Sequence, residues 1–221
     1  MVKTIVEAKD ICLTYHEING ETLAVDRLSF TVSKGEFVSI VGPSGCGKTS
    51  VLSMLAGLIA PSSGQLSIEG GRPGYMLQRD HLLDWRTIEG NILLGLQVQG
   101  RLNPESREKA MALLETYGLA DFAKSYPRQL SGGMRQKVAI ASAQAIEPEI
   151  YVMDEPSANL DSDAMVRLGT LLYRLKAAGH TIILSEHRFH YVRDSFDRLV
   201  FMENGEISAI YGHGEALELS A

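Results

Sequence analysis

The sequence has few cysteines, no excess of basic charge and no long apolar run. Cys12 and Cys46 are its only cysteines in 221 residues, so a disulfide framework is excluded and a reduced, cytosolic chain is expected. The net charge of −6 argues against a dedicated nucleic-acid-binding protein, and we expect no nucleic-acid partner. The longest apolar stretches, such as residues 51–60, are shorter than the roughly 18 residues that suggest a membrane span.

The amino terminus also lacks the pattern of a secretory signal peptide. Residues 1–4 lead straight into an alternating strand pattern, without a charged start and an apolar block. Any membrane role is therefore expected to come through a partner. The composition, 45% hydrophobic and 22% charged, is that of an ordinary soluble α/β protein, and 221 residues suit one domain with an inserted subdomain.

A phosphate-binding loop is the first chemical motif. Residues 42–49 fit the pattern G-x-x-x-x-G-K-[ST], between the apolar run 37–41 and a helical pattern. Such a loop lets backbone N–H groups and a helix start bind an anion. We expect Lys48 to reach the β- and γ-phosphates and Thr49 to bind Mg²⁺, while the position of Cys46 predicts a reactive thiolate. The nucleotide-binding residues predicted here are Gly42, Pro43, Ser44, Gly45, Cys46, Gly47, Lys48, Thr49 and Ser50.

The apolar pattern divides the chain into three regions. Residues 4–15 and 23–32 predict an antiparallel hairpin around a turn at Asn19. Residues 87–145 are almost entirely helical and form a candidate inserted subdomain. The last third alternates strands and helices, which predicts a parallel sheet with helices on both faces. The other predicted elements are a helix at 47–58, strands at 65–68, 74–77, 150–153, 181–184 and 199–202, and a final strand after a turn at 203–206.

Two carboxylates end an apolar strand in this last third. Asp154 and Glu155 follow residues 150–153, and we expect their strand to lie next to the phosphate-loop strand. Asp154 would then lie near the Mg²⁺ position, and Glu155 would face a water in line with the γ-phosphate. Taken alone, the same residues would fit a solvated turn that ends a strand.

A second helix start that suits an anion lies at Ser131, Gly132 and Gly133. By itself, this triplet is most often just a helix cap. One nucleotide hardly needs two such sites. The second site therefore either binds a different phosphate or reaches the nucleotide held by another copy of the chain.

Together and in this order, the motifs resemble the nucleotide-binding subunit of ATP-binding cassette (ABC) transporters, across essentially the whole chain. The resemblance implies an α/β phosphate-loop NTPase (RecA-like) core with an antiparallel β subdomain and a helical subdomain insertion at about residues 87–145, all within a single domain over residues 1–221. It also implies that the signature at residues 130–133 closes over the ATP of a second copy or a homologous ATPase subunit, so that two chains sandwich two nucleotides.

The resemblance further assigns roles to single residues. Tyr15 would stack on adenine, Gln78 would sense Mg²⁺ and water, and His187 would hold the γ-phosphate and the attacking water, while residues 157–161 would contact the opposite subunit. The rival His190 is expected to be a surface helix residue. The catalytic residues are then Glu155, His187, Lys48 and Gln78, and the Mg²⁺ ligands are Thr49, Gln78 and Asp154.

The function implied by the resemblance is that of the ATP-hydrolysing subunit of a membrane importer. It would work on the cytoplasmic face of the membrane, with integral membrane subunits and a substrate-binding protein or component. The front half looks like importers for nitrate, sulfonate, taurine or thiamine precursors, and the rear half looks like the ATPases of energy-coupling-factor importers for vitamins and metal ions. Such a mixture leaves the cargo open and fits a divergent natural sequence, a recombinant or a designed chain. The segments concerned are residues 74–78, 82–87 and 131–136 for the first group and 137–142, 157–161 and 185–188 for the second.

Three alternatives stay open at this point. A soluble ATP-dependent switch or assembly factor is a second class, although such relatives usually carry tandem cassettes or long insertions, which this chain lacks. An inactive binding scaffold is disfavoured, because no catalytic position is visibly lost.

Trp85 lies in the segment after Gln78, and we predict that it forms part of a contact surface for the membrane subunit. The alternative is that its side chain packs locally against the rest of the chain.

Overall fold

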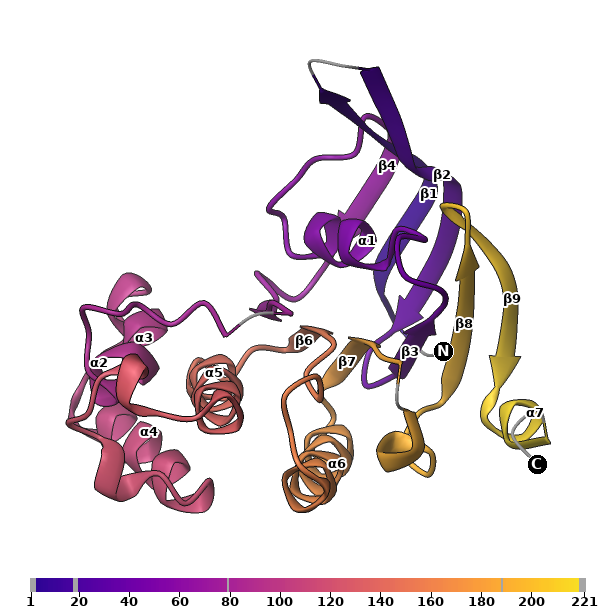
Figure 1. Ribbon diagram of the computed structural model, residues 1–221. Helices are drawn as coiled ribbons and strands as arrows, with labels where there is room; N and C mark the ends of the chain where they lie inside the picture. Colours follow the sequence, from indigo (N-terminus) through magenta and orange to yellow (C-terminus); the bar gives the residue numbers. More distant parts are fainter. Residues whose placement is uncertain (1–2, 18–19, 79, 188, 219–221) are drawn as a thin grey trace.

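An antiparallel sheet in the order β2-β1-β4 forms the N-terminal part of the computed structural model (Figure 1). The long alternating runs of the sequence explain it, because Val6, Ala8 and Leu13 are buried. The predicted hairpin is confirmed with longer strands, while its turn residue Asn19 lies outside the described residues. The structure describes residues 3–17, 20–78, 80–187 and 189–218, and this sheet consists of β1 (Thr4–Glu17), β2 (Gly20–Ser33) and β4 (Ser63–Ile68).

A larger sheet in the order β5-β6-β7-β3-β8-β9 forms the centre of the molecule. Its strands run parallel from β5 to β8, and β9 joins β8 in antiparallel pairing. The predicted parallel sheet is therefore confirmed. The strands are β3 (Phe37–Val41), β5 (Gly74–Met76), β6 (Ile150–Asp154), β7 (Thr181–Ser185), β8 (Arg198–Glu203) and β9 (Glu206–Gly212).

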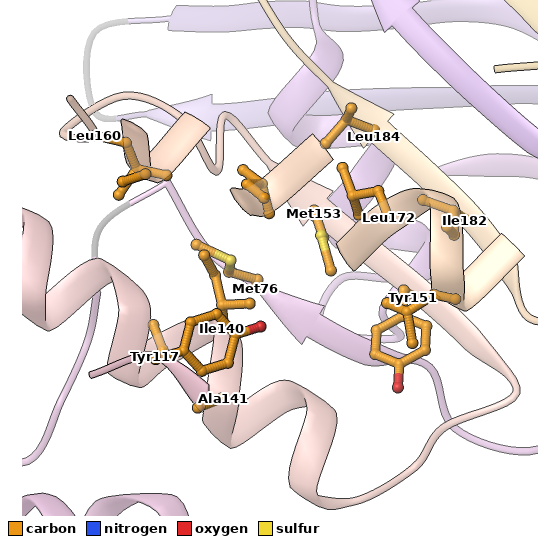
Figure 2. Packing of buried hydrophobic residues seen from close by; sticks show 14 of the residues in the cluster. Met76, Tyr117, Ile140, Ala141, Tyr151, Met153, Leu160, Leu172, Ile182 and Leu184 are labelled. Atoms are coloured by element: carbon orange, nitrogen blue, oxygen red, sulfur yellow. The ribbon is translucent and has the colours of Figure 1, made fainter. Parts of the chain in front are cut away.

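Both faces of the larger sheet are covered, as its continuous apolar strands require. In β6, Val152 joins a cluster with α1 (Lys48–Leu55) and the N-terminal sheet. Its neighbours Tyr151 and Met153 join the cluster on the opposite face, which Figure 2 shows packed against residues of α5 (Gly132–Ala145) and α6 (Ser162–Ala177). The sheet thus holds the start of α1 on one face and the start of α6 on the other.

The predicted helical insertion is present between β5 and β6 (Figure 1). Pro104 occupies the first turn of α4, behind a capping box formed by Asn103 and Ser106. The buried Glu89 carboxylate pairs with both Arg107 and Lys124, which joins separate helices of the insertion. The insertion comprises α2 (Ile88–Ile92), α3 (Leu94–Val98), α4 (Pro104–Thr116), η1 (Ala120–Phe122), η2 (Pro127–Gln129) and α5.

One predicted neighbour relationship is wrong. The strand that ends at Asp154, β6, does not lie beside the phosphate-loop strand β3, because β7 lies between them. Strand order is set by long-range packing, which a local apolar pattern does not encode. His190 was expected on a surface helix, and it lies in the short helix η3 (Phe189–Val192). The helix α7 (His213–Glu218), which follows the last strand, was not predicted. Within the described part of the chain, no helix combines the length and hydropathy needed to cross a membrane.

The contact between α6 and η3 gives the first testable prediction. A Cβ atom on Gly169 would lie 2.4 Å from the carbonyl oxygen of Tyr191. Gly169→Ala should therefore lower the free energy of unfolding by about 1–3 kcal/mol, the usual cost of overpacking. Gly214→Ala is the matched control in a helix, because its Cβ would meet no atom within 4 Å. The control should be neutral or stabilising by up to about 1 kcal/mol. Equal effects in urea denaturation would contradict the packing described.

Candidate functional site

The phosphate loop connects β3 to α1 and requires glycine at its end. Gly47 has φ +102°, and a Cβ atom there would lie 2.4 Å from the carbonyl oxygen of Ala24. The next residue, Lys48, is buried, and its ammonium group donates to the carbonyls of Gly42 (2.8 Å) and Pro43 (3.0 Å). The loop therefore folds around the ammonium group of Lys48 at the start of α1.

Cys46 lies in this loop but does not have the exposure of a reactive cysteine. Its side chain is only 4% exposed and belongs to the apolar cluster on the α1 face. The ammonium group of Lys48 is 3.8 Å from the sulfur. Because reagents cannot reach a buried thiol, the prediction of a reactive thiolate is wrong for this conformation. The sequence predicts that Cys46 lies in the loop, but it does not predict the direction of its side chain.

Tyr15 lies beside the end of the phosphate loop, where it contacts Ser50, 35 positions further along the sequence. Its hydroxyl is 3.2 Å from the hydroxyl of Ser50, which belongs to the first turn of α1. The ring remains 36% exposed. Thr49 is exposed at the same helix start. The structure thus brings an exposed aromatic ring, a helix start and the buried lysine together.

Asp154 ends β6 as a buried carboxylate with one free oxygen. Ser185, the last residue of β7, donates its hydroxyl to Oδ1 of Asp154 (2.5 Å). The other oxygen, Oδ2, is buried and has no hydrogen-bond partner among the described residues. A buried polar atom without a partner costs stability, so such an atom points to a ligand. Burial raises the pKa of the Tyr75 phenol, and the negative charge of Asp154 raises it further.

Glu155 follows in a strained conformation and joins two other predicted residues. Its φ of +46° is unusual for a residue with a side chain. Gln78 donates to one carboxylate oxygen (2.9 Å), and Nε2 of His187 lies 2.8 Å from the other. The backbone N–H of Glu155 bonds the carbonyl of Ser185 at 3.0 Å, which fixes the turn. Segments from β5, β6 and β7 therefore meet at one carboxylate.

The second predicted anion site lies elsewhere. Ser131 caps α5, where its hydroxyl accepts from the N–H of Met134 (3.3 Å), and Gly132 and Gly133 open the helix. Among the described residues, no hydrogen bond or ion pair joins residues 131–133 to residues 42–50, and Figure 1 draws α5 apart from α1. Within one chain, the two anion sites do not form a single site.

The structure also separates the rival histidines and adds residues that were not predicted. His190 is exposed on η3, as expected for a surface residue, while His187 faces Glu155. Ser185 and Glu186, directly before His187, are buried polar residues with hydrogen bonds to the site or its supporting loops. The sequence does contain a signal for Ser185 and Glu186, because two polar residues follow directly on the apolar residues of β7.

Comparison with known proteins agrees with this geometry. The ABC transporter family model matches residues 25–158, which is more than half of the chain. The chain belongs to the ABC transporter family. The ABC transporter ATP-binding protein YtlC of Bacillus subtilis (strain 168) is 46% identical over 182 residues, which cover 79% of this chain and 70% of YtlC. The ABC transporter ATP-binding protein MJ1508 of Methanocaldococcus jannaschii is 34% identical to this chain. The alignment covers 93% of this chain and 99% of MJ1508.

Import proteins and solved cassettes are also similar to this ABC chain. The methionine import ATP-binding protein MetN of Carboxydothermus hydrogenoformans is 36% identical over 83% of this chain, which spans 59% of MetN. A dimeric structure of the ATP-binding cassette MJ0796, bound to ADP and Pi, matches with a TM-score of 0.88 and 29% identity, covering 95% of this chain and 99% of that one. The predicted fold class is confirmed, and the chain is an ATP-binding and ATP-hydrolysing cassette.

Proposed function

We propose that this cassette works in pairs, in which two chains sandwich two molecules of Mg-ATP and drive a membrane importer. The observation that carries the proposal is the position of Glu155. Its carboxylate lies between Gln78 and His187 and directly follows the buried carboxylate of Asp154. A positioned base with two orienting partners is the arrangement that hydrolysis of a phosphoanhydride needs.

The phosphate loop and Tyr15 would hold ATP. Lys48 would exchange the loop carbonyls that it now contacts for β- and γ-phosphate oxygens, while the backbone N–H groups of residues 42–50 surround the phosphates. The exposed ring of Tyr15, tied to Ser50 at the same helix start, would stack on the adenine.

The free oxygen of Asp154 fits a Mg²⁺ ligand. Mg²⁺ commonly binds proteins through one or two carboxylates together with substrate phosphates, so a single buried carboxylate oxygen at the end of β6 suits it. The Thr49 hydroxyl and the Gln78 amide would complete the protein ligands. When bound, Mg²⁺ neutralises negative charge on the phosphate oxygens.

Hydrolysis would then depend on Glu155, His187, Gln78 and Lys48. Glu155 accepts a proton from the attacking water, and His187 and Gln78, which both contact its carboxylate, hold the carboxylate and the water in place. Lys48 stabilises the charge that develops on the transferred phosphoryl group.

A second chain would complete each site. Gly133 approaches the carbonyl oxygen of Asn159, so a Cβ atom on this glycine would lie 3.1 Å from it. The signature at residues 131–133 and the loop at residues 157–161 therefore lie together, and both can face one partner. The partner's ATP would bind to the start of α5, which is separate from this chain's own phosphate loop.

Integral membrane subunits would bind at a groove beside the helical insertion. The groove has a volume of about 470 Å³ and is lined by apolar residues that include Met76, Leu82 and Val98. Trp85 lies three residues beyond Leu82 and is 74% exposed, which does not support local packing of its ring. The groove would receive a short cytoplasmic helix of the membrane subunit and place the cassette on the inner face of the membrane.

The direction of transport rests on the import named for MetN, to which this chain is 36% identical. A substrate-binding protein or component would then deliver the cargo from outside. The resemblance of the front half to importers of nitrate, sulfonate, taurine and thiamine precursors, and of the rear half to vitamin and metal-ion importers, leaves both groups of cargo as candidates.

The substitution Glu155→Gln tests the sandwich. It preserves the size of the side chain and removes the base, so ATP should still bind while hydrolysis falls by about 10²- to 10⁴-fold. Light scattering should show monomers with ADP and dimers with ATP. Monomers under both conditions, with bound ATP verified, would contradict the pair of chains as a property of the isolated cassette.

The matched control places Ser131→Arg in the same background. The added bulk lies at the start of α5, away from this chain's phosphate loop, so the monomer should bind ATP nearly as well as before. The ATP-dependent dimer should disappear. A dimer that persists would show that residues 131–133 do not face the partner.

The substitution Trp85→Ala tests the membrane partner. Loss of this exposed ring, three residues beyond the groove residue Leu82, should reduce copurification with the membrane subunits. The melting temperature should stay nearly unchanged, because the ring is mostly exposed. Tyr173→Ala is the matched control, since Tyr173 is an aromatic residue that is 59% exposed on α6, far in sequence from the segment that contains Trp85. Unchanged copurification together with a lower melting temperature would favour local packing of Trp85.

A further inference from the structure

Glu186 is a buried carboxylate directly before His187. Its side chain is 2% exposed, and burying a carboxylate is costly unless hydrogen bonds compensate. Oε1 accepts from the N–H of Ser157 (3.0 Å) and from the hydroxyl of Tyr191 (2.6 Å), and Oε2 accepts from the N–H of His187 (3.2 Å). One side chain therefore connects three segments of the chain.

The segment that contains Glu186 and Tyr191 is linked to both ends of the loop 157–161. Ser157 begins the loop, and Asp161 ends it by capping α6, where its carboxylate accepts from Ala164 (2.8 Å). Further along α6, Gly169 packs against the carbonyl of Tyr191. Both ends of the loop are thus linked to the segment that contains Glu186.

Glu186 is also hydrogen-bonded to β3 and to the backbone of His187, which is one of the predicted catalytic residues. The backbone N–H of Glu186 donates to the carbonyl of Ile40 in β3 (3.2 Å), so its position is fixed relative to the phosphate-loop strand. The Oε2 atom holds the backbone of His187, whose ring contacts Glu155. One carboxylate therefore joins Ser157 at the start of the loop to the backbone of His187, the residue that contacts Glu155.

We propose that Glu186 is a positioning residue that couples the loop 157–161 to His187. The inference rests on the proposed function, in which a partner chain presses on this loop and His187 orients the water. When the partner engages the loop, the Ser157 N–H and the His187 N–H stay joined through the same carboxylate. The histidine then holds Glu155 in position only when the loop is in place.

The chemistry of the carboxylate makes the proposal specific. Glutamine at this position retains one acceptor oxygen and replaces the other by an N–H₂ group, which cannot accept from a backbone N–H. Glu186→Gln therefore breaks one side of the connection, while Glu186→Ala breaks both sides. Tyr191→Phe removes the hydroxyl that donates to Glu186 from η3 and leaves the bonds of Glu186 to Ser157 and His187 in place.

The test measures kcat, the affinity for a fluorescent ATP analogue and the melting temperature of each variant. We expect Glu186→Ala to lower kcat by about 10- to 100-fold, the size of effect that a small misplacement of a catalytic group produces, with nucleotide affinity within about twofold. Glu186→Gln should fall between Ala and wild type, and Tyr191→Phe should lie closest to wild type.

Glu89→Ala is the matched control, because Glu89 is also a buried, paired carboxylate but lies in the helical insertion. It should lower the melting temperature and keep kcat within about twofold of wild type. A kcat for Glu186→Ala within twofold of wild type, or an equal loss in both variants, would overturn the inference. If Glu186→Ala is insoluble, an unchanged kcat in Glu186→Gln overturns it. Unchanged hydrolysis in Glu155→Gln would instead overturn the proposed function.

Discussion

The hydrogen-bonded carboxylate of Glu155 is the interaction on which the rest of the site depends. Glu155 directly follows β6 with a φ of +46°, and its two carboxylate oxygens contact Gln78 and His187. Those partners come from the ends of β5 and β7, the strands on either side of β6. Parallel pairing is what brings three chain segments to one edge of the sheet, and the apolar strands stabilise that pairing by burial on both faces.

The same sheet accounts for the division of the molecule into two functional surfaces. On one face, α1 and the N-terminal sheet enclose the phosphate loop, with Tyr15 beside it. On the other face, α5 and α6 pack on the cluster of Figure 2, and the starts of both helices lie together through Gly133 and Asn159. In the proposed pair, one surface would bind the chain's own nucleotide and the other would bind the nucleotide of the partner. That arrangement would account for two helix starts that suit an anion in a single chain.

The parts of the fold and site that depend on local sequence could be predicted. The phosphate loop, the N-terminal hairpin and the helical insertion follow from spacing and composition, and the structure contains them. The strand order could not be predicted, because β7 enters between β6 and β3 through contacts that are distant in sequence. The burial of Cys46 and the bonds of Glu186 to Ser157 and Tyr191 were missed for the same reason, since both depend on which neighbours the folded chain supplies.

In the proposed pair, a complete ATPase site needs residues of two chains. The most direct measurement is the rate of ATP hydrolysis by the wild-type cassette at saturating Mg-ATP, over protein concentrations at which light scattering reports mainly monomers. We expect the rate per chain to rise in proportion to concentration, because residues 131–133 of a monomer lie apart from its own phosphate loop. A rate per chain that stays constant over that range would contradict it.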